Sequence, residues 1–328
     1  MDVSIIVPFY NSEQYIKRAL DSALQQKFKG EFEVIIVNDG SSDTSGSVCK
    51  EYLAEFYDQL IYLEHKENRG VSAARNTAMD LMRGEYFTFL DADDILPANA
   101  IQKMYDLAEE KKSDIVLGSI KRVYENVDLQ EKASKKHTII LDGDQGLIEL
   151  MNHKSIRGHV WGKLFKNKKN QKIQFSSDLR YAEDLLFCAD IFANSDSICV
   201  SDSPCYIYCQ HEQSTVRKKF ERFLYVDWIR SVDLIGEKYE KVKFQKPYYR
   251  LKIKTIHQLA RELRFAKKNE FEQVIAHVKE KISIWQISLM GLIRNRSLSL
   301  TNLIKIGQIN YILWKLSKKA GKNKGLSI

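Results

Sequence analysis

The sequence predicts an α/β protein in which a mostly parallel sheet flanked by helices is followed by a helical C-terminal region. Short apolar runs alternate with amphipathic segments over the first 120 residues, and the pattern beyond Arg217 is almost continuously helical. Alternation of this kind is typical of βαβ units, which build parallel sheets. With 328 residues, of which 44% are hydrophobic, the chain can form one large domain or two ordinary ones.

Five apolar runs in the first 120 residues are predicted strands: 3–9, 32–39, 60–65, 85–91 and 113–119. The segments between them have apolar side chains at helical spacing and are predicted helices: 12–26, 47–57, 71–82 and 98–111. Open parallel sheets bind ligands in the crevice at the carboxyl ends of their strands. Tyr10, Asp39 and Asp91 lie at such strand ends and are therefore candidate site residues.

The rest of the chain divides by pattern and by charge. Residues 121–215 are mixed, so we predict an α/β domain at 1–215 and a helical, basic region at 216–328. One helix of that region is predicted from apolar spacing at Leu251, Thr255, Gln258, Leu259 and Leu263. No Asp or Glu occurs after residue 280, so the net charge of +8 belongs to the end of the chain. Its cations are Lys281, Arg294, Arg296, Lys305, Lys315, Lys318, Lys319, Lys322 and Lys324.

The last part of this tail, residues 309–322, has the pattern of an amphipathic helix. One face is apolar, with Ile309, Ile312, Leu313 and Leu316, the other is cationic, with Lys315, Lys318, Lys319 and Lys322, and Trp314 lies near the boundary. One interpretation is an interfacial helix that binds an anionic membrane surface. The alternative is a helix packed on the body of the protein. Nucleic-acid binding is not expected, because no recognisable module is present.

Cysteine usage and the N-terminus predict a cytoplasmic protein. The five cysteines, Cys49, Cys188, Cys199, Cys205 and Cys209, form no CxxC pair, and the N-terminus lacks a secretory leader. We therefore expect buried, reduced thiols. No run of 18 apolar residues occurs, so no simple membrane-spanning helix is expected.

Three carboxylates lie at the end of the fourth predicted strand, in the stretch FLDADD at residues 89–94. Mg²⁺ and Mn²⁺ often take one or two carboxylates from a protein and complete their shell with substrate phosphates. Asp91 and Asp93 can face the crevice together, whereas Asp94 points away or caps the following helix. The alternative is that all three carboxylates cap that helix. A metal site would replace the glycine-rich phosphate loops, because the first strand leads into PFYN and the chain has neither GxGxxG nor a P-loop.

Six segments in order resemble the motifs of family 2 glycosyltransferases, which are inverting enzymes of the GT-A fold. They are SIIVPFYN (4–11), VNDGSSDTS (37–45), ENRGVSAARNTA (67–78), GEYFTFLDADD (84–94), WGKLF (161–165) and YAEDLLF (181–187). Each motif alone is weak, but six in this order are specific. The resemblance implies a GT-A-like catalytic domain at 1–215, a UDP-sugar donor, and Mn²⁺ or Mg²⁺ held by Asp93 and Asp91.

The resemblance also implies roles for individual donor-site residues. Asp39 corresponds to the carboxylate that binds uracil, and an acceptor-only group suits the N3–H of that base. The alternative is an ordinary turn aspartate. Pro8 and Tyr10 would line the base and ribose pocket. Arg75 would approach the diphosphate or be a solvated helix residue. The remaining expected donor contacts are Asn68, Asp91 and Ala92.

Glu183 and Asp184 match the acidic pair that the family uses on the acceptor side. We predict Asp184 as the general base and Glu183 as an acceptor-binding residue. The alternative is a helix N-terminal pair without a catalytic role. Segment 206–215 resembles a later family motif, in which His211 or Ser214 would touch the phosphates or the metal, although a lone histidine is more often structural.

The predicted function is inverting transfer of a sugar from a UDP-sugar to a hydroxyl of a glycan or lipid-linked acceptor in bacterial surface polysaccharide synthesis. No motif separates glucose from galactose or their N-acetyl forms. The alternatives are an inactive scaffold, a sugar nucleotidyltransferase and a glycosidase. A nucleotidyltransferase would have a glycine-rich basic loop after the first strand, and a glycosidase leaves the two aspartate motifs unexplained. The expected location is cytoplasmic, with peripheral contact to the inner face of the cell membrane if the tail binds lipid.

Overall fold

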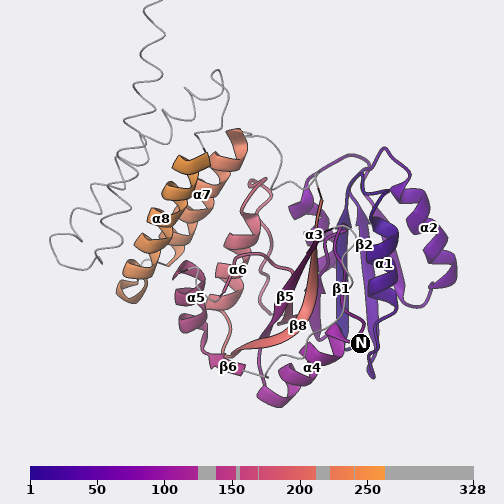
Figure 1. The fold of residues 1–328 in the computed structure, drawn as a ribbon, viewed down its shortest axis with the longest axis horizontal. Helices are drawn as coiled ribbons and strands as arrows, with labels where there is room; N and C mark the ends of the chain where they lie inside the picture. Colours follow the sequence, from indigo (N-terminus) through magenta and orange to yellow (C-terminus); the bar gives the residue numbers. More distant parts are fainter. Residues whose placement is uncertain (125–137, 153–155, 169, 212–221, 240, 263–328) are drawn as a thin grey trace, which may run out of the picture. The chain divides into compact units, whose positions relative to one another are not determined.

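The structure is a computed structural model that describes residues 1–124, 138–152, 156–168, 170–211, 222–239 and 241–262 (Figure 1). The chain forms two compact units. The first consists of residues 1–147 and 158–214, and the second of residues 148–157 and 215–328. All predicted site residues belong to the first unit.

An eight-stranded sheet forms the centre of the first unit, in the order β3-β2-β1-β4-β7-β5-β8-β6. The strands are β1 Val3–Phe9, β2 Phe32–Asn38, β3 Leu60–Glu64, β4 Tyr86–Phe89, β5 Ile115–Tyr124, β6 Thr138–Leu141, β7 Lys163–Lys166 and β8 Ile198–Gln210. Strands β1 to β4 are parallel to one another, as are β5 and β8. Strand β7 runs antiparallel between β4 and β5, and β6 runs antiparallel to β8. The prediction of a mostly parallel sheet is therefore confirmed.

Helices cover both faces of this sheet. One face packs against α1 (Ile16–Leu24), α2 (Ser45–Glu55) and α4 (Ala100–Lys111) through a single buried apolar cluster. The other face carries α3 (Val71–Met79), which packs on β1 and β2, and α6 (Glu183–Ala193). Phe187 of α6 lies edge-on to Phe89 and Phe165 of the sheet. Helix α5 spans Gly143–Asn152.

The predicted strands and helices of the first 120 residues are all present. The helices are shorter than predicted, or begin up to four residues from the predicted first residue. The cysteines are free and buried, as expected. The antiparallel insertion of β7 has no counterpart in the sequence prediction. This inversion places the residues before β7 at the edge where the parallel strands end, next to the carboxylates that follow β4.

In the second unit, helices α7 (Arg222–Lys238) and α8 (Val242–Glu262) pack against each other. Leu251 and Thr255 of the predicted apolar stripe are buried, but Gln258 is exposed, so the stripe is narrower than predicted. Among the described residues, no helix has the length and apolarity that crossing a bilayer requires. Leu263 and the predicted tail helix lie outside the described residues.

Candidate active site

The loop after β4 places Asp91 and Asp93 at the carboxyl edge of the sheet, as the spacing predicted. Their side chains are 30% and 33% exposed. Asp91 accepts a hydrogen bond from Arg75 Nη2 at 3.2 Å, and Asp93 Oδ2 lies 2.8 Å from Nε2 of His211. The ring of His211 stacks on Tyr15 with centroids 4.4 Å apart. His211, which directly follows β8, is therefore brought to the acidic loop from 118 residues away in the chain.

Asp94, by contrast, is buried and serves the fold. It accepts hydrogen bonds from the Tyr206 hydroxyl at 2.7 Å and from the Cys209 backbone N–H at 2.8 Å, which ties the loop to β8. Burial, followed by the charges of Asp91 and Asp93, raises the pKa of Asp94 to about 8. The expectation that Asp94 caps the next helix is wrong, since α4 begins after Asn99 with no side-chain cap. Its carboxylate is bound to β8 instead.

Arg75 of α3 links two acidic motifs that are far apart in the sequence. Its Nη1 donates to Glu183 at 2.9 Å and its Nη2 to Asp91 at 3.2 Å. The guanidinium lies over the rings of Phe89 and Phe175, and Arg75 is only 5% exposed. It is therefore not a solvated helix residue. Its predicted approach to a diphosphate stays a prediction, because both terminal nitrogens are engaged with carboxylates.

Glu183 and Asp184 form the first turn of α6, where the helix dipole favours negative charge. The turn is set by Ala182, whose φ of 58° is costly for a residue with a Cβ. Glu183 is buried, and Asp184 accepts a hydrogen bond from the Leu185 N–H at 2.8 Å. Burial and the neighbouring Glu183 raise the pKa of Asp184 to about 7, although Arg75 opposes the shift. A carboxylate with this pKa suits a general base near neutral pH.

Lys163 and His159 were missed by sequence reasoning. Lys163, in the WGKLF motif, is 2% exposed, and its Nζ donates to the His159 carbonyl and lies 3.2 Å from His159 Nδ1. Burial lowers the pKa of Lys163, whereas Cys188 and Asp184 act in the opposite direction. A second buried cation thus lies in the electrostatic field of the predicted base.

On the other side of β4, Asp39 is almost fully enclosed. Its Oδ1 accepts from the Arg69 N–H at 3.0 Å and lies 2.7 Å from Nδ1 of His65, and its Oδ2 accepts from the Gly70 N–H at 2.8 Å. Gly40, with a φ of 70°, permits this approach, because a Cβ there would lie 2.6 Å from the Glu67 carbonyl carbon. Asp39 thus fixes the loop before α3 whatever else it binds.

His65 is a third residue that the sequence analysis missed. Its Nε2 lies 3.0 Å from the Thr77 hydroxyl, so the ring joins Asp39 to α3. Among the other predicted donor contacts, Pro8 and Ala92 are buried, Asn68 is exposed and Tyr10 is 48% exposed. Asn11, with a φ of 47°, turns the chain directly after Tyr10. Ser214 lies outside the described residues.

The family model "Glycosyl transferase family 2" matches residues 4–178, which is more than half of the chain. The chain belongs to this family. The matched segment contains the Asp39, Arg75 and Asp91 regions and the WGKLF motif, whereas the Glu183–Asp184 pair lies just beyond it.

Similar proteins agree with the family and with the fold. The glycosyltransferase GlyA of Streptococcus pneumoniae is 33% identical in an alignment 194 residues long that covers 53% of this chain and 25% of GlyA. The chain thus matches about a quarter of that relative. The structure of S. aureus TarS 1–349 in complex with UDP-GlcNAc is 21% identical, with a TM-score of 0.59 over 90% of this chain and 92% of that 1–349 chain. The mannosyltransferase PcManGT from Pyrobaculum calidifontis, in complex with GDP-Man and Mn²⁺, is 16% identical. Its TM-score is 0.52 over 97% of this chain and 86% of the PcManGT chain. At these identities the two structures show the GT-A fold.

The acidic loop of this family 2 glycosyltransferase fits a hard divalent cation. One oxygen of Asp93 and one of Asp91 have no hydrogen-bond partner within the described part of the chain, and both side chains are partly exposed. No group of three or more potential ligands forms among the described residues. Such a site suits Mg²⁺ or Mn²⁺, which keep open positions for phosphate oxygens and water.

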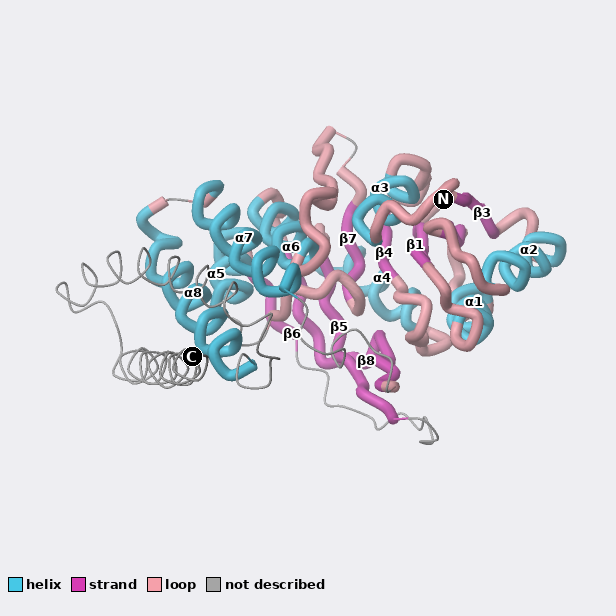
Figure 2. Tube along the Cα trace, turned by 90° about the horizontal axis from the view of Figure 1, so that it is seen from above, coloured by secondary structure: helices cyan, strands magenta, loops and turns pink. Residues whose placement is uncertain are grey.

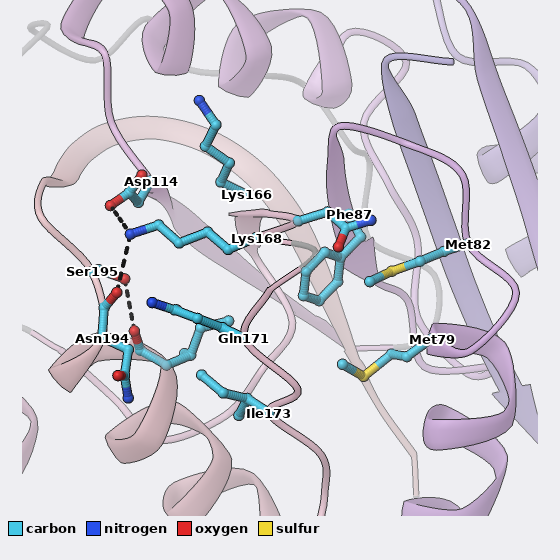
Figure 3. A pocket seen from close by; sticks show the side chains of 12 residues that line it. Met79, Met82, Phe87, Asp114, Lys166, Lys168, Gln171, Ile173, Asn194 and Ser195 are labelled. Carbon is cyan, nitrogen blue, oxygen red and sulfur yellow. Dashed lines mark hydrogen bonds and ion pairs between the residues drawn. The ribbon is translucent and has the colours of Figure 1, made fainter.

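A pocket lies elsewhere on the family 2 fold, at the amino ends of the parallel strands (Figure 3). Met79, Met82 and Phe87 supply its apolar side, and Lys168 lies opposite, paired with Asp114 at 2.8 Å. The crevice that GT-A-like sheets use for ligands is at the other edge. This pocket therefore lies away from the candidate site.

Proposed function

We propose that the protein transfers a sugar from a UDP-sugar, with inversion, to a hydroxyl of a glycan or lipid-linked acceptor, with the help of Mn²⁺ or Mg²⁺. The observation that supports it most is the pair of ion pairs of Arg75. They hold Asp91, on the predicted metal side, and Glu183, on the predicted acceptor side, around one guanidinium. A single residue thus brings together the two acidic motifs that are predicted to serve the metal and the acceptor.

In this proposal Asp184 removes the proton of the acceptor hydroxyl while that oxygen attacks C1 of the donor sugar. The bond between C1 and the diphosphate oxygen breaks on the opposite face, its electron pair leaves with UDP, and the proton stays on Asp184. A cation held by Asp93 and Asp91 would stabilise the charge on the leaving diphosphate. Arg75 keeps Asp91 and Glu183 in place, and its charge opposes the rise in the pKa of Asp184.

The proposal that the donor is a UDP-sugar rests on Asp39 and on the similarity to solved structures. TarS is similar in fold and was solved with UDP-GlcNAc, but PcManGT has the same fold and was solved with GDP-Man. The fold therefore does not select the base. Asp39 Oδ2 accepts one hydrogen bond, from Gly70, which leaves it capacity for the N3–H of uracil. Cytosine has no hydrogen at N3, so the same carboxylate would reject CDP.

The proposal is tested with a panel of UDP-sugars and Mn²⁺, by measuring release of UDP with and without candidate glycan acceptors. UDP should compete better than CDP or GDP. Asp184→Asn keeps the size of the side chain but does not take up the proton, so transfer should fall about 10²–10⁴-fold while UDP-sugar still binds. Transfer within a few-fold of the unaltered protein would remove Asp184 as the base. Formation of UTP and sugar 1-phosphate from a UDP-sugar when pyrophosphate is added would indicate the nucleotidyltransferase, and no turnover of any UDP-sugar would indicate the scaffold.

We also propose that the product belongs to a bacterial surface polysaccharide made at the inner face of the cell membrane. The support is the resemblance and the basic end of the chain, whose membrane contact lies outside the described residues. Binding of the full chain and of a chain ending at residue 302 to anionic liposomes at low salt separates the two interpretations of the tail.

A further inference from the structure

Strands β5 and β8 continue together past the rest of the sheet as a two-stranded ribbon (Figure 2). The register shifts on both sides of Ser119, and beyond it the pairs are Ile120 with Tyr206, Arg122 with Tyr208, and Tyr124 with Gln210. Opposed residues of paired strands project from the same face of a sheet, and faces alternate along each strand. One face of the ribbon therefore carries these six residues.

The opposite face of the ribbon is already filled. Val123, Ile207 and Cys209 are buried there against Ile95, which follows the acidic loop and bridges to Ile207. The ribbon is thus attached through this face to the loop of Asp91 and Asp93. The first face remains partly open, because Arg122 is exposed and Tyr124 is 59% exposed.

Aromatic rings continue this open face toward the predicted base. Trp161 is half-buried and lies nearly parallel to Tyr208, with centroids 5.3 Å apart and an 8° angle between planes. Its ring also stacks on Tyr206 at 4.9 Å and on His159 at 3.6 Å. His159 contacts Lys163, the buried cation in the field of Asp184. We call Trp161, Tyr208, Arg122 and Tyr124 the aromatic strip.

The strand order places the aromatic strip away from the proposed nucleotide pocket. Asp39 and Tyr10 follow β2 and β1, on one side of β4, whereas β7, β5 and β8 lie on the other side. Asp91, at the end of β4, separates the two halves. The Tyr206 hydroxyl accepts the Asp91 N–H at 3.1 Å and donates to Asp94, so the strip begins directly beside the acidic loop. When the donor is bound over β1, β2 and β4, the aromatic strip remains open to the second substrate, the acceptor.

The chemistry of the strip suits a saccharide. Pyranose rings have apolar C–H faces, which pack on aromatic side chains, and hydroxyls, which accept hydrogen bonds from tyrosine and guanidinium donors. Arg122 has no ion pair among the described residues, so its donors are available. We propose that the aromatic strip is the acceptor subsite and holds the sugar units next to the attacking hydroxyl. This inference rests on the proposed glycosyl transfer and adds where the acceptor saccharide binds.

The test presents the full chain, with UDP and Mn²⁺, to an array of bacterial oligosaccharides. Arg122→Ala and Tyr124→Ala change exposed side chains and should each lower glycan retention about tenfold, as expected for contacts worth more than 1 kcal/mol. Tyr57→Ala is the matched control, because Tyr57 is 73% exposed and directly precedes the segment leading to β3, at the other end of the sheet. The control should keep the retention of the unaltered chain. UDP affinity, measured by calorimetry, should stay the same in all three variants.

Equal glycan retention by the strip variants and the control would overturn the proposal, and so would an unaltered chain that retains no glycan. Loss of UDP affinity in Arg122→Ala would assign the strip to the donor instead. Failure of the proposed function would give a different result, because no UDP-sugar would then be hydrolysed. Glycan retention and its dependence on the aromatic strip could still be measured in that case.

Discussion

The two edges of the central sheet use charge in different ways. At the amino edge, Lys168 lies beside an apolar pocket and pairs with Asp114 and with Asp196, so its charge is balanced by neighbours. At the carboxyl edge, buried Arg75 pairs with Asp91 and Glu183 and lies in the field of Asp184, so the acids around it outnumber this cation. The pocket is at the balanced edge and the proposed chemistry at the unbalanced one. We therefore take an excess of acids, which favours a bound cation or proton, as a better indication of a functional site than a cavity.

The largest effect expected from this contrast is at Asp93. Asp93→Ala removes the partly exposed carboxylate that is predicted to hold the metal, and UDP affinity in the presence of Mn²⁺ should fall roughly a hundredfold or more, since even residues behind metal ligands are worth 10–100-fold. Calorimetry with UDP measures this, with and without Mn²⁺. Unchanged affinity in a folded variant would show that the excess acids at this edge do not serve a metal.

Substitution of Asp94 should lower the stability of the fold. Asp94→Ala leaves the Tyr206 hydroxyl and the Cys209 N–H without their buried partner, which costs about 1–3 kcal/mol for each group. We therefore expect the free energy of unfolding to fall by about 3 kcal/mol in chemical denaturation. Asp94→Asn is the matched control, because it keeps an oxygen for Cys209 and should lose less. A full loss of metal-dependent UDP binding in a stable Asp94→Ala variant would instead make Asp94 part of the metal site.

These two aspartates also show how far the sequence could predict the site. The strand ends, the acidic loop and the 183–184 pair were all expected from local pattern and motif order. The partners of those residues were not, because Tyr206 meets Asp94 across 112 positions and Glu183 meets Arg75 across 108. His65 and Lys163 are polar residues whose roles depend on burial beside Asp39 and His159. No local periodicity encodes such contacts, and the inverted direction of β7 brings Lys163 there.

The pH dependence of turnover should follow Asp184. Its pKa is raised to about 7 by burial and by Glu183, and the base must be ionised to accept a proton. Thus kcat/KM should rise about tenfold per pH unit below 7 and level off above it. Glu183→Gln removes the like charge, so the acidic limb should move to lower pH. A flat profile between pH 5.5 and 8, or an unmoved limb in Glu183→Gln, would contradict this assignment.

The smallest effect is expected at the amino edge of the sheet. Substitution of Lys168 there is the counterpart of the substitutions at the carboxyl edge. Its side chain is 25% exposed, and Asp196 is 95% exposed, so water screens much of this interaction. Ion pairs of this kind are worth about 0–1 kcal/mol, so Lys168→Ala should lower the free energy of unfolding by less than about 1 kcal/mol. Turnover of UDP-sugars should stay unchanged, because the pocket beside Lys168 lies across the sheet from the acids. A tenfold loss of turnover with unchanged stability would show that the amino edge contributes to catalysis. The proposed functional difference between the two edges would then be wrong.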